Sequence, residues 1–123
     1  MNYRILAVAA LASLMFVACG KKEEAAAAAP ADEGKTLYEQ RCASCHGLHG
    51  KGDGPAAASL DPKPRDHTNV AWHGTVTDAD IEKIIGEGGA AVKKSPLMPP
   101  QPDLKGTPKI KELVKYVRSL KGK

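Results

Sequence analysis

The residues with the clearest capacity for chemistry are Cys42, Cys45 and His46, which form a Cys-x-x-Cys-His motif. A Cys-x-x-Cys pair can form a redox-active disulfide, supply half of a zinc site or attach a haem. A disulfide oxidoreductase requires a strand–helix context, and no convincing strand precedes Cys42. A zinc site requires two more ligands at metal-binding spacing, and neither a second cysteine pair nor a His-x₃₋₅-His pattern follows.

Haem attachment explains the histidine that directly follows the second cysteine. On one helical turn, the sulfurs of Cys42 and Cys45 can reach the two vinyl groups on one edge of a porphyrin. The imidazole of His46 then turns toward the iron. The sequence therefore predicts one covalent haem c with His46 as its first axial ligand.

Several stretches around the motif resemble those of class I monohaem cytochromes c, and the resemblance covers nearly all of residues 33–123. These stretches are Lys35 to Glu39, Cys42 to Gly47, Gly52 to Pro55, Lys63 to Asp66 and Ser95 to Pro100. The resemblance implies an all-α fold, the small cytochrome c fold, with three main helices and loops around one covalent haem c.

Met98 is the expected sixth ligand of the iron. It is the only methionine after the N-terminal segment, and Pro96, Pro99 and Pro100 restrict the loop that carries it. The family resemblance points the same way. The alternative is that Met98 only fills the core, which is the usual role of methionine.

Three other histidines compete for the iron. His49 is too close to His46 in the chain to cross to the other face of a haem. His67 and His73 lie in a long connecting region, where surface positions are expected and a bis-histidine haem stays an alternative.

Three more residues are expected near the haem. Trp72 and Arg65 are candidates for hydrogen bonds to the haem propionates. Pro55 resembles the family proline whose carbonyl accepts a hydrogen bond from the axial imidazole, which would fix the ring.

Three helices are expected to position these groups. The first spans about residues 32–43. The second begins after an N-cap at Thr77 and ends at residues 86–89, which are rich in glycine. The last has Thr107 as its N-cap and Pro108 at its first position.

The first and last helices are expected to cross closely, because in related cytochromes a glycine at a place like Gly34 permits a short approach. Tyr116 of the last helix should meet the first helix near Gly34. Residues 47–72 are rich in Gly, Pro and Asp and are expected to wrap the haem as loops.

The N-terminus has the order of a secretory signal: one Arg, an apolar run of 13 residues from Ile5 to Val17, and then small residues. A helix of that length rises only about 20 Å, too short to span a bilayer. Residues 16–19 resemble a lipobox with Cys19 as the lipidated residue. Residues 1–18 are therefore expected to be a lipoprotein signal peptide, 19–32 a flexible tether and 33–123 the cytochrome c domain.

This organisation predicts a protein that is exported to the periplasmic side of a bacterial membrane and anchored there through the lipid on Cys19. A lipoprotein that is retained in the inner membrane usually has Asp shortly after its lipidated cysteine. This chain has Lys21 and Lys22 there instead, so the outer membrane is favoured over the inner one. Covalent haem attachment also takes place outside the cytoplasm in bacteria.

Charge is distributed unevenly along the chain. Residues 32–89 hold six basic and ten acidic side chains, whereas residues 90–123 hold nine basic and two acidic ones. This lysine-rich C-terminal part, which includes Lys93 and Lys94, can be an ordinary solvated surface or can steer an acidic redox partner. An exported chain without interleaved aromatic residues is not expected to bind nucleic acid.

Together these features predict an electron-transfer protein and not an enzyme, with His/Met axial ligation at one haem. Its partners would be other cytochromes, an oxidase or a reductase. Two alternatives stay open: a haem subunit of a larger oxidase or dehydrogenase complex, and a haem enzyme or gas sensor in which Met98 does not bind the iron.

Overall fold

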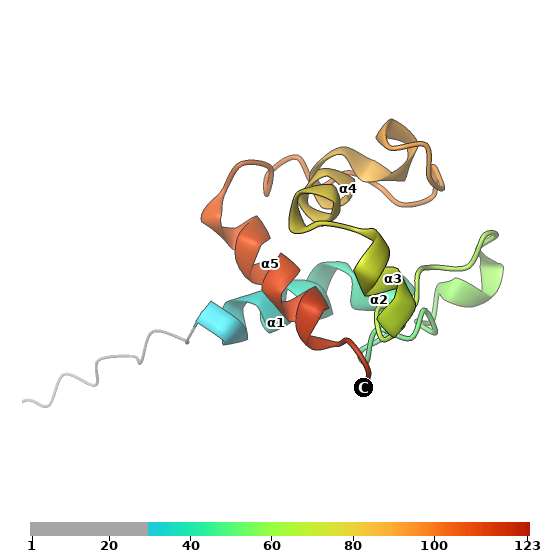
Figure 1. Cartoon of the computed structure of the whole chain (residues 1–123). Coiled ribbons are helices and arrows are strands. Elements are labelled where there is room, and N and C mark those ends of the chain that lie inside the picture. The colour runs from blue at the N-terminus through green and yellow to red at the C-terminus, as the bar shows by residue number, and fades with distance from the viewer. Residues whose placement is uncertain (1–29) are drawn as a thin grey trace, which may run out of the picture.

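The computed structural model describes residues 30–123, and their side chains from residue 33 onward (Figure 1). The expected signal peptide, the lipidated Cys19 and most of the tether therefore lie outside the described residues. Within them all regular structure is helical, which confirms the expected all-α fold. The elements are α1 (Pro30–Arg41), α2 (Ala43–His46), the 3-10 helix η1 (Ala57–Ser59), α3 (Val70–Thr75), α4 (Asp78–Ala91) and α5 (Pro108–Ser119). No helix in this part of the chain is long and apolar enough to cross a membrane.

The crossing of α1 and α5 is the largest contact between helices (Figure 1). A Cβ atom on Gly34 would overlap the carbonyl oxygen of Glu112 and would lie 3.2 Å from the Cβ of Tyr116. Glycine therefore permits the close approach of the two backbones, and the predicted meeting of Tyr116 with Gly34 is confirmed.

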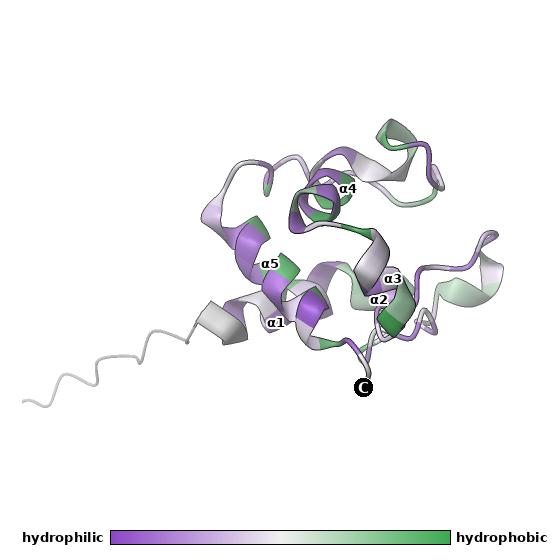
Figure 2. Ribbon diagram, viewed as in Figure 1, coloured by the Kyte–Doolittle hydropathy of each residue, from purple (hydrophilic) through white to green (hydrophobic). Residues whose placement is uncertain are grey.

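The core gathers around α5, whose apolar residues recur at helical spacing and alternate with charged ones (Figure 2). The core residues that α5 and the following turn contribute are Ile110, Leu113, Val114, Val117 and Leu120. The other helices and the loop before α5 contribute further buried residues: Leu37, Tyr38, Ala43, Ile81, Ile85 and Leu104.

The ends of the longer helices follow the expected signals with two differences. Thr77 caps α4 through a reciprocal pair of hydrogen bonds with Asp80, as predicted. At Gly88 the backbone of α4 leaves helical geometry, with φ of 80°, and a last turn continues to Ala91. Pro108 opens α5 as expected, but the hydroxyl of Thr107 donates to the carbonyl of Leu104 instead of capping the helix.

The prediction that residues 47–72 form only loops was wrong at two places, η1 and the start of α3. Asn69 begins α3, because its side-chain oxygen accepts a hydrogen bond of 2.9 Å from the backbone N–H of Trp72. The first predicted helix also divides, since α1 ends at Arg41 and α2 starts at Ala43.

Candidate functional site

The Cys-x-x-Cys-His motif occupies a single helical turn. Cys42 immediately precedes α2, and its carbonyl accepts hydrogen bonds from the backbone N–H groups of Cys45 (3.1 Å) and His46 (2.9 Å). Cys45 and His46 lie three and four positions after Cys42, so each of them shares a helix face with Cys42. Both thiols are free and half-buried. Burial raises the pKa of the Cys42 thiol to about 11, an environment that suits an uncharged thioether.

The ring of His46 makes one hydrogen bond, from its Nδ1 to the carbonyl oxygen of Arg65 over 2.9 Å. A carbonyl oxygen can only accept, so Nδ1 carries the proton and the lone pair of Nε2 is free for a metal. Burial lowers the pKa of His46, an effect that the bond to Arg65 opposes only in part. His46 is therefore a neutral imidazole with a free Nε2, the form that binds iron.

The acceptor for His46 was predicted to be the carbonyl of Pro55, and this was wrong. The backbone N–H of Gly54 donates to the carbonyl of Cys45 over 3.1 Å, which holds this loop against the end of α2. Pro55 is exposed there. Pro55 follows His46 by nine positions, and the carbonyl that accepts from the imidazole belongs instead to a residue nineteen positions away.

His67 is stacked on the imidazole of His46. The two ring centroids lie 4.3 Å apart, with 14° between the planes. Trp72 stacks on His67 at 5.3 Å and 29°. The hydroxyl of Tyr38, which is 0% exposed, lies 3.1 Å from Nδ1 of His67. Burial, and then the positive charges that His46 and its neighbours would carry, lower the pKa of His67 to about 3.

This stacking changes the interpretation of the competing histidines. Two axial ligands must approach one iron from opposite faces, whereas His67 lies beside the ring of His46 and nearly parallel to it. His73 is only 6% exposed, and both of its ring nitrogens have partners. Its Nε2 donates to the carbonyl of His67 over 2.7 Å, and its Nδ1 accepts from Arg118 over 3.2 Å. The expected surface positions of His67 and His73 were therefore wrong, and neither side chain is placed as a sixth ligand.

Arg118 is a residue that sequence reasoning missed. Its guanidinium donates to the carbonyls of His73 (2.9 Å) and Val76 (2.7 Å) and to a carboxylate oxygen of Asp78 (2.8 Å). One side chain of α5 thus ties down the end of α3 and the start of α4. Its position in the last turn of a helix predicts only a favourable interaction with the helix dipole.

The loop that carries Met98 packs closely against the glycine-rich end of α4. The backbone N–H of Gly89 donates to the carbonyl of Met98 over 3.0 Å. A Cβ atom on Gly88 would lie 2.9 Å from the nitrogen of Pro100, and one on Gly89 would overlap the carbonyl oxygen of Ser95. The side chain of Met98 is half-buried and packs against the core.

The remaining predicted site residues differ in exposure. The side chain of Arg65 is exposed, although its main-chain carbonyl binds His46. Trp72 is half-buried and packs against the core as well as against His67. A propionate contact for either side chain stays a prediction.

The donor set fits a covalent haem better than the other chemistries of a Cys-x-x-Cys pair. Two free thiols and a neutral imidazole share one helical turn, which is what two thioether bonds and an axial ligand require. Within residues 30–123 no cluster of three or more His, Cys, Asp or Glu side chains could hold a metal ion, which argues against the zinc site.

Comparison with known proteins agrees with this geometry. The sequence profile of the family described as Cytochrome c matches residues 31–121. Among solved structures, the chain is similar to one described as "KustC0563 c-type cytochrome", with a TM-score of 0.59 and 28% sequence identity. The match covers 72% of this chain and 96% of that one. No curated protein matches the chain significantly. The family match spans most of the sequence, including the thiols and imidazole that fit a covalent haem c, and the chain therefore belongs to the cytochrome c family.

Proposed function

We propose that the protein is a one-electron carrier whose single haem c is bound axially by His46 and Met98. The bound haem supplies a reversible one-electron couple at iron. Two observations together carry the proposal. His46 is neutral and its Nε2 is free, and Met98 is the only methionine after residue 18 and lies on a loop that is hydrogen-bonded to the end of α4.

The chain's own residues then have separate tasks. Cys42 and Cys45 anchor the haem, and the hydrogen bond to Arg65 orients His46. The thioether of Met98 fills the position where oxygen, peroxide or carbon monoxide would otherwise bind, which favours electron transfer over catalysis. A methionine ligand also raises the reduction potential relative to histidine. Trp72 and Arg65 remain the proposed hydrogen-bond donors to the propionates.

We place the protein on the periplasmic side of a bacterial membrane, tethered through a lipid on Cys19 and in the outer membrane in preference to the inner one. The support is the signal-like order of residues 1–18 and the lipobox-like residues 16–19. Mass spectrometry of the mature native protein tests this, because acylated Cys19 should be its first residue. A mature chain that begins elsewhere or lacks the lipid would contradict it.

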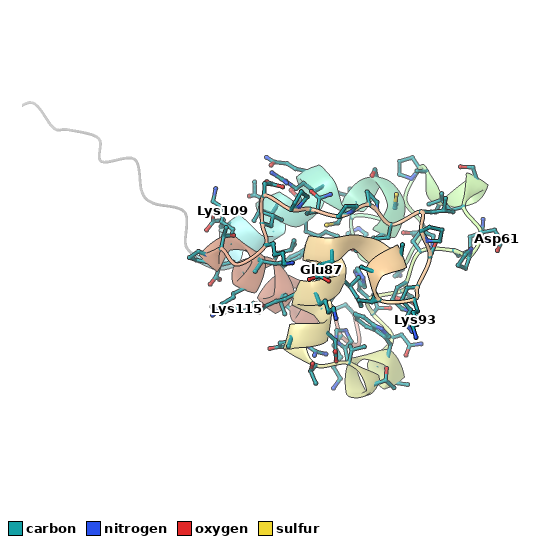
Figure 3. The ribbon with its side chains drawn as sticks, turned by 90° about the horizontal axis from the view of Figure 1, so that it is seen from above. Asp61, Glu87, Lys93, Lys109 and Lys115 are labelled. Carbon is teal, nitrogen blue, oxygen red and sulfur yellow. The ribbon has the colours of Figure 1, made fainter. Side chains whose placement is uncertain are left out.

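We propose that an acidic redox partner docks on only some of the lysines in the lysine-rich C-terminal part. Lys109 pairs with Glu33 and Lys115 with Glu112, so these lysines are partly neutralised. Lys93 lies at the other end of the molecule from both (Figure 3). Lys93 and Lys94 are exposed near the Met98 loop, where Leu97 is 49% exposed, and they are the lysines that we propose for docking.

Optical spectra of the holoprotein test the axial ligands. The ferric protein should show the charge-transfer band of a methionine–iron bond, and the ferrous protein should bind carbon monoxide slowly at neutral pH. M98A should lose the band and bind carbon monoxide rapidly, whereas L97A, at the exposed neighbouring residue, should behave like the wild type. Rapid binding by the wild type, or an unchanged spectrum in M98A, would refute His/Met ligation.

A further inference from the structure

Three aromatic rings, those of His46, His67 and Trp72, form a continuous stack that starts at the axial imidazole (here called the proximal stack). We propose that His67 is a positioning residue: its ring fixes the plane of the His46 imidazole relative to the haem. The inference rests on the proposed axial role of His46, and it assigns no contact between His67 and the iron.

The hydrogen bond from His46 to Arg65 leaves one motion of the ring free. That bond restrains a single nitrogen at the ring edge, so the imidazole can still swing about the line through Nδ1 and its acceptor. The nearly parallel ring of His67, with its centroid 4.3 Å away, lies against one face of His46 and limits this swing. The two contacts together determine both the direction and the plane of the ring.

His67 can act as such a support only if it is itself held, and four contacts hold it. Its backbone N–H donates to the carbonyl of Gly50 over 2.6 Å, and its carbonyl accepts from His73 over 2.7 Å. Its Nδ1 contacts the hydroxyl of Tyr38 at 3.1 Å, and Trp72 covers its second face. These partners come from α1, α3 and the loop after α2, so the ring of His67 is anchored to the rest of the fold.

The side chain at position 67 must also offer a hydrogen-bonding atom to Tyr38, in addition to a flat ring face to His46. Tyr38 is completely buried, and a buried hydroxyl that is left without a partner destabilises the fold. An aliphatic residue at position 67 would fill the space but leave this hydroxyl unpaired. Histidine supplies both a flat face for His46 and a hydrogen-bonding nitrogen for Tyr38.

The plane of the axial imidazole has a measurable consequence. Through its π overlap with iron, this plane decides how unpaired spin is distributed over the porphyrin edge in the ferric state. Outer-shell groups that orient a metal ligand tune the centre in this way. A fixed plane therefore gives one defined pattern of spin density, and a swinging ring gives an averaged one.

Proton NMR of the ferric cyanide complex of the holoprotein tests the proposal. Cyanide displaces Met98 and is axially symmetric, so the hyperfine shifts of the four haem methyl groups report the plane of His46 alone. H67A should reorder or compress these four shifts. H67F keeps a flat ring and should keep the wild-type order, even though it loses the bond to Tyr38. L104A serves as the control, because it opens a cavity at a core residue outside the proximal stack and should lower Tm without changing the shifts.

Each outcome decides the proposal. A wild-type pattern in H67A shows that His67 only fills space, and equal reordering in H67A and H67F shows that stacking is not the cause. A shift change in L104A as large as that in H67A would attribute the effect to general loosening. If His46 is not the axial ligand, the wild-type spectrum itself lacks the strongly shifted ring protons of a coordinated histidine. That result overturns the proposed function as well, and it is recognised before any variant is made.

Discussion

Nδ1 of His46 donates a hydrogen bond to the main-chain carbonyl oxygen of Arg65, over 2.9 Å. Because the acceptor belongs to the main chain, the orientation of the axial imidazole depends on the path of the backbone and not on the side chain at position 65. That path is shaped by the next residue. A carboxylate oxygen of Asp66 accepts hydrogen bonds of 2.7 Å from both the backbone N–H and the hydroxyl of Thr68.

The first prediction compares the two neighbouring residues. D66A should loosen the turn, because it removes both bonds to Thr68, and should speed the exchange of the His46 Nδ1 proton with solvent, followed by NMR. R65A should leave this exchange at the wild-type rate, because the acceptor for His46 is the main-chain carbonyl of residue 65. Faster exchange in R65A than in D66A would mean that the side chain of Arg65 supports the ring.

The second prediction concerns the seat of the Met98 loop. In G89A the new methyl group would overlap the carbonyl oxygen of Ser95 and would lie 3.4 Å from the Cβ of Met98. The loop must therefore shift, so the ferric methionine band should weaken and binding of external imidazole should become faster. The matched control is G74A, since a Cβ at Gly74 meets nothing within 4 Å. G74A should leave the band intact and be neutral or stabilising by up to about 1 kcal/mol. An unchanged band in G89A would show that the loop is seated by other contacts.

The third prediction concerns the crossing of α1 and α5. G34A places a methyl group against the backbone of Glu112, which cannot rotate away as a side chain can. Overpacking of this kind costs roughly 1–3 kcal/mol, so the midpoint of denaturant unfolding should fall in proportion. The visible spectrum of the folded protein should stay that of the wild type, because the haem-binding motif lies at the other end of α1. A stability equal to that of the wild type would show that the helices can separate without loss.

The fourth prediction concerns Arg118. R118K keeps the charge but cannot reach two carbonyls and a carboxylate at once, because lysine lacks the planar fork of the guanidinium. The loss should be about 2 kcal/mol, the order of one charge-assisted hydrogen bond, measured by chemical unfolding. K111A, which changes an exposed lysine on the same helix, is the control and should have little effect. A loss in R118K no larger than that in K111A would mean that the ties between α3, α4 and α5 contribute little to stability.

The fifth prediction concerns the N-terminal cap of α4 and its pH dependence. Hydrogen bonds from the backbone N–H and the hydroxyl of Thr77 lower the pKa of Asp80 below its ordinary 3.8. A carboxyl whose pKa is lower in the folded state stabilises the fold above pH 3.8, and this contribution disappears as the pH falls through the lowered pKa.

Two variants separate the cap from the charge. T77A removes the cap and should cost about 1 kcal/mol at neutral pH. The stability difference between the wild type and D80N should be present at neutral pH and should shrink below pH 3.8. A difference that is the same at pH 7 and pH 3 would mean that the charge of Asp80 does not contribute.

Two features could be predicted from the sequence: the helical turn that carries the motif, and the close approach of two helices at a glycine. The Cys42–His46 motif is local, so its helical turn followed from spacing alone. The resemblance to related cytochromes, carried here by Gly34, predicted the crossing of the first and last helices, and a Cβ atom at Gly34 would indeed meet the backbone of Glu112 and the Cβ of Tyr116.

The parts that could not be predicted depend on the path of the long connection. The acceptor for His46 was assigned to Pro55, because Pro55 resembles the family proline whose carbonyl takes this role. The carbonyl of Arg65 takes this role once the bond from His67 to Gly50 folds the connection back. His73 is buried and His67 is half-buried, although both are polar and lack any periodic pattern. Their partners, Tyr38 and Arg118, come from the two ends of the domain.

The contact between α1 and α5 also has a consequence for the order of events in the cell. Translation produces residues 108–119 after the other described helices, and until they emerge the face of α1 that holds Gly34 and Tyr38 lacks the helix that it packs against. The thiols of Cys42 and Cys45, made some sixty residues earlier, belong to an open chain during that interval. The core around α1 therefore cannot close on a nascent chain that lacks residues 108–119, because these residues form its largest helix contact.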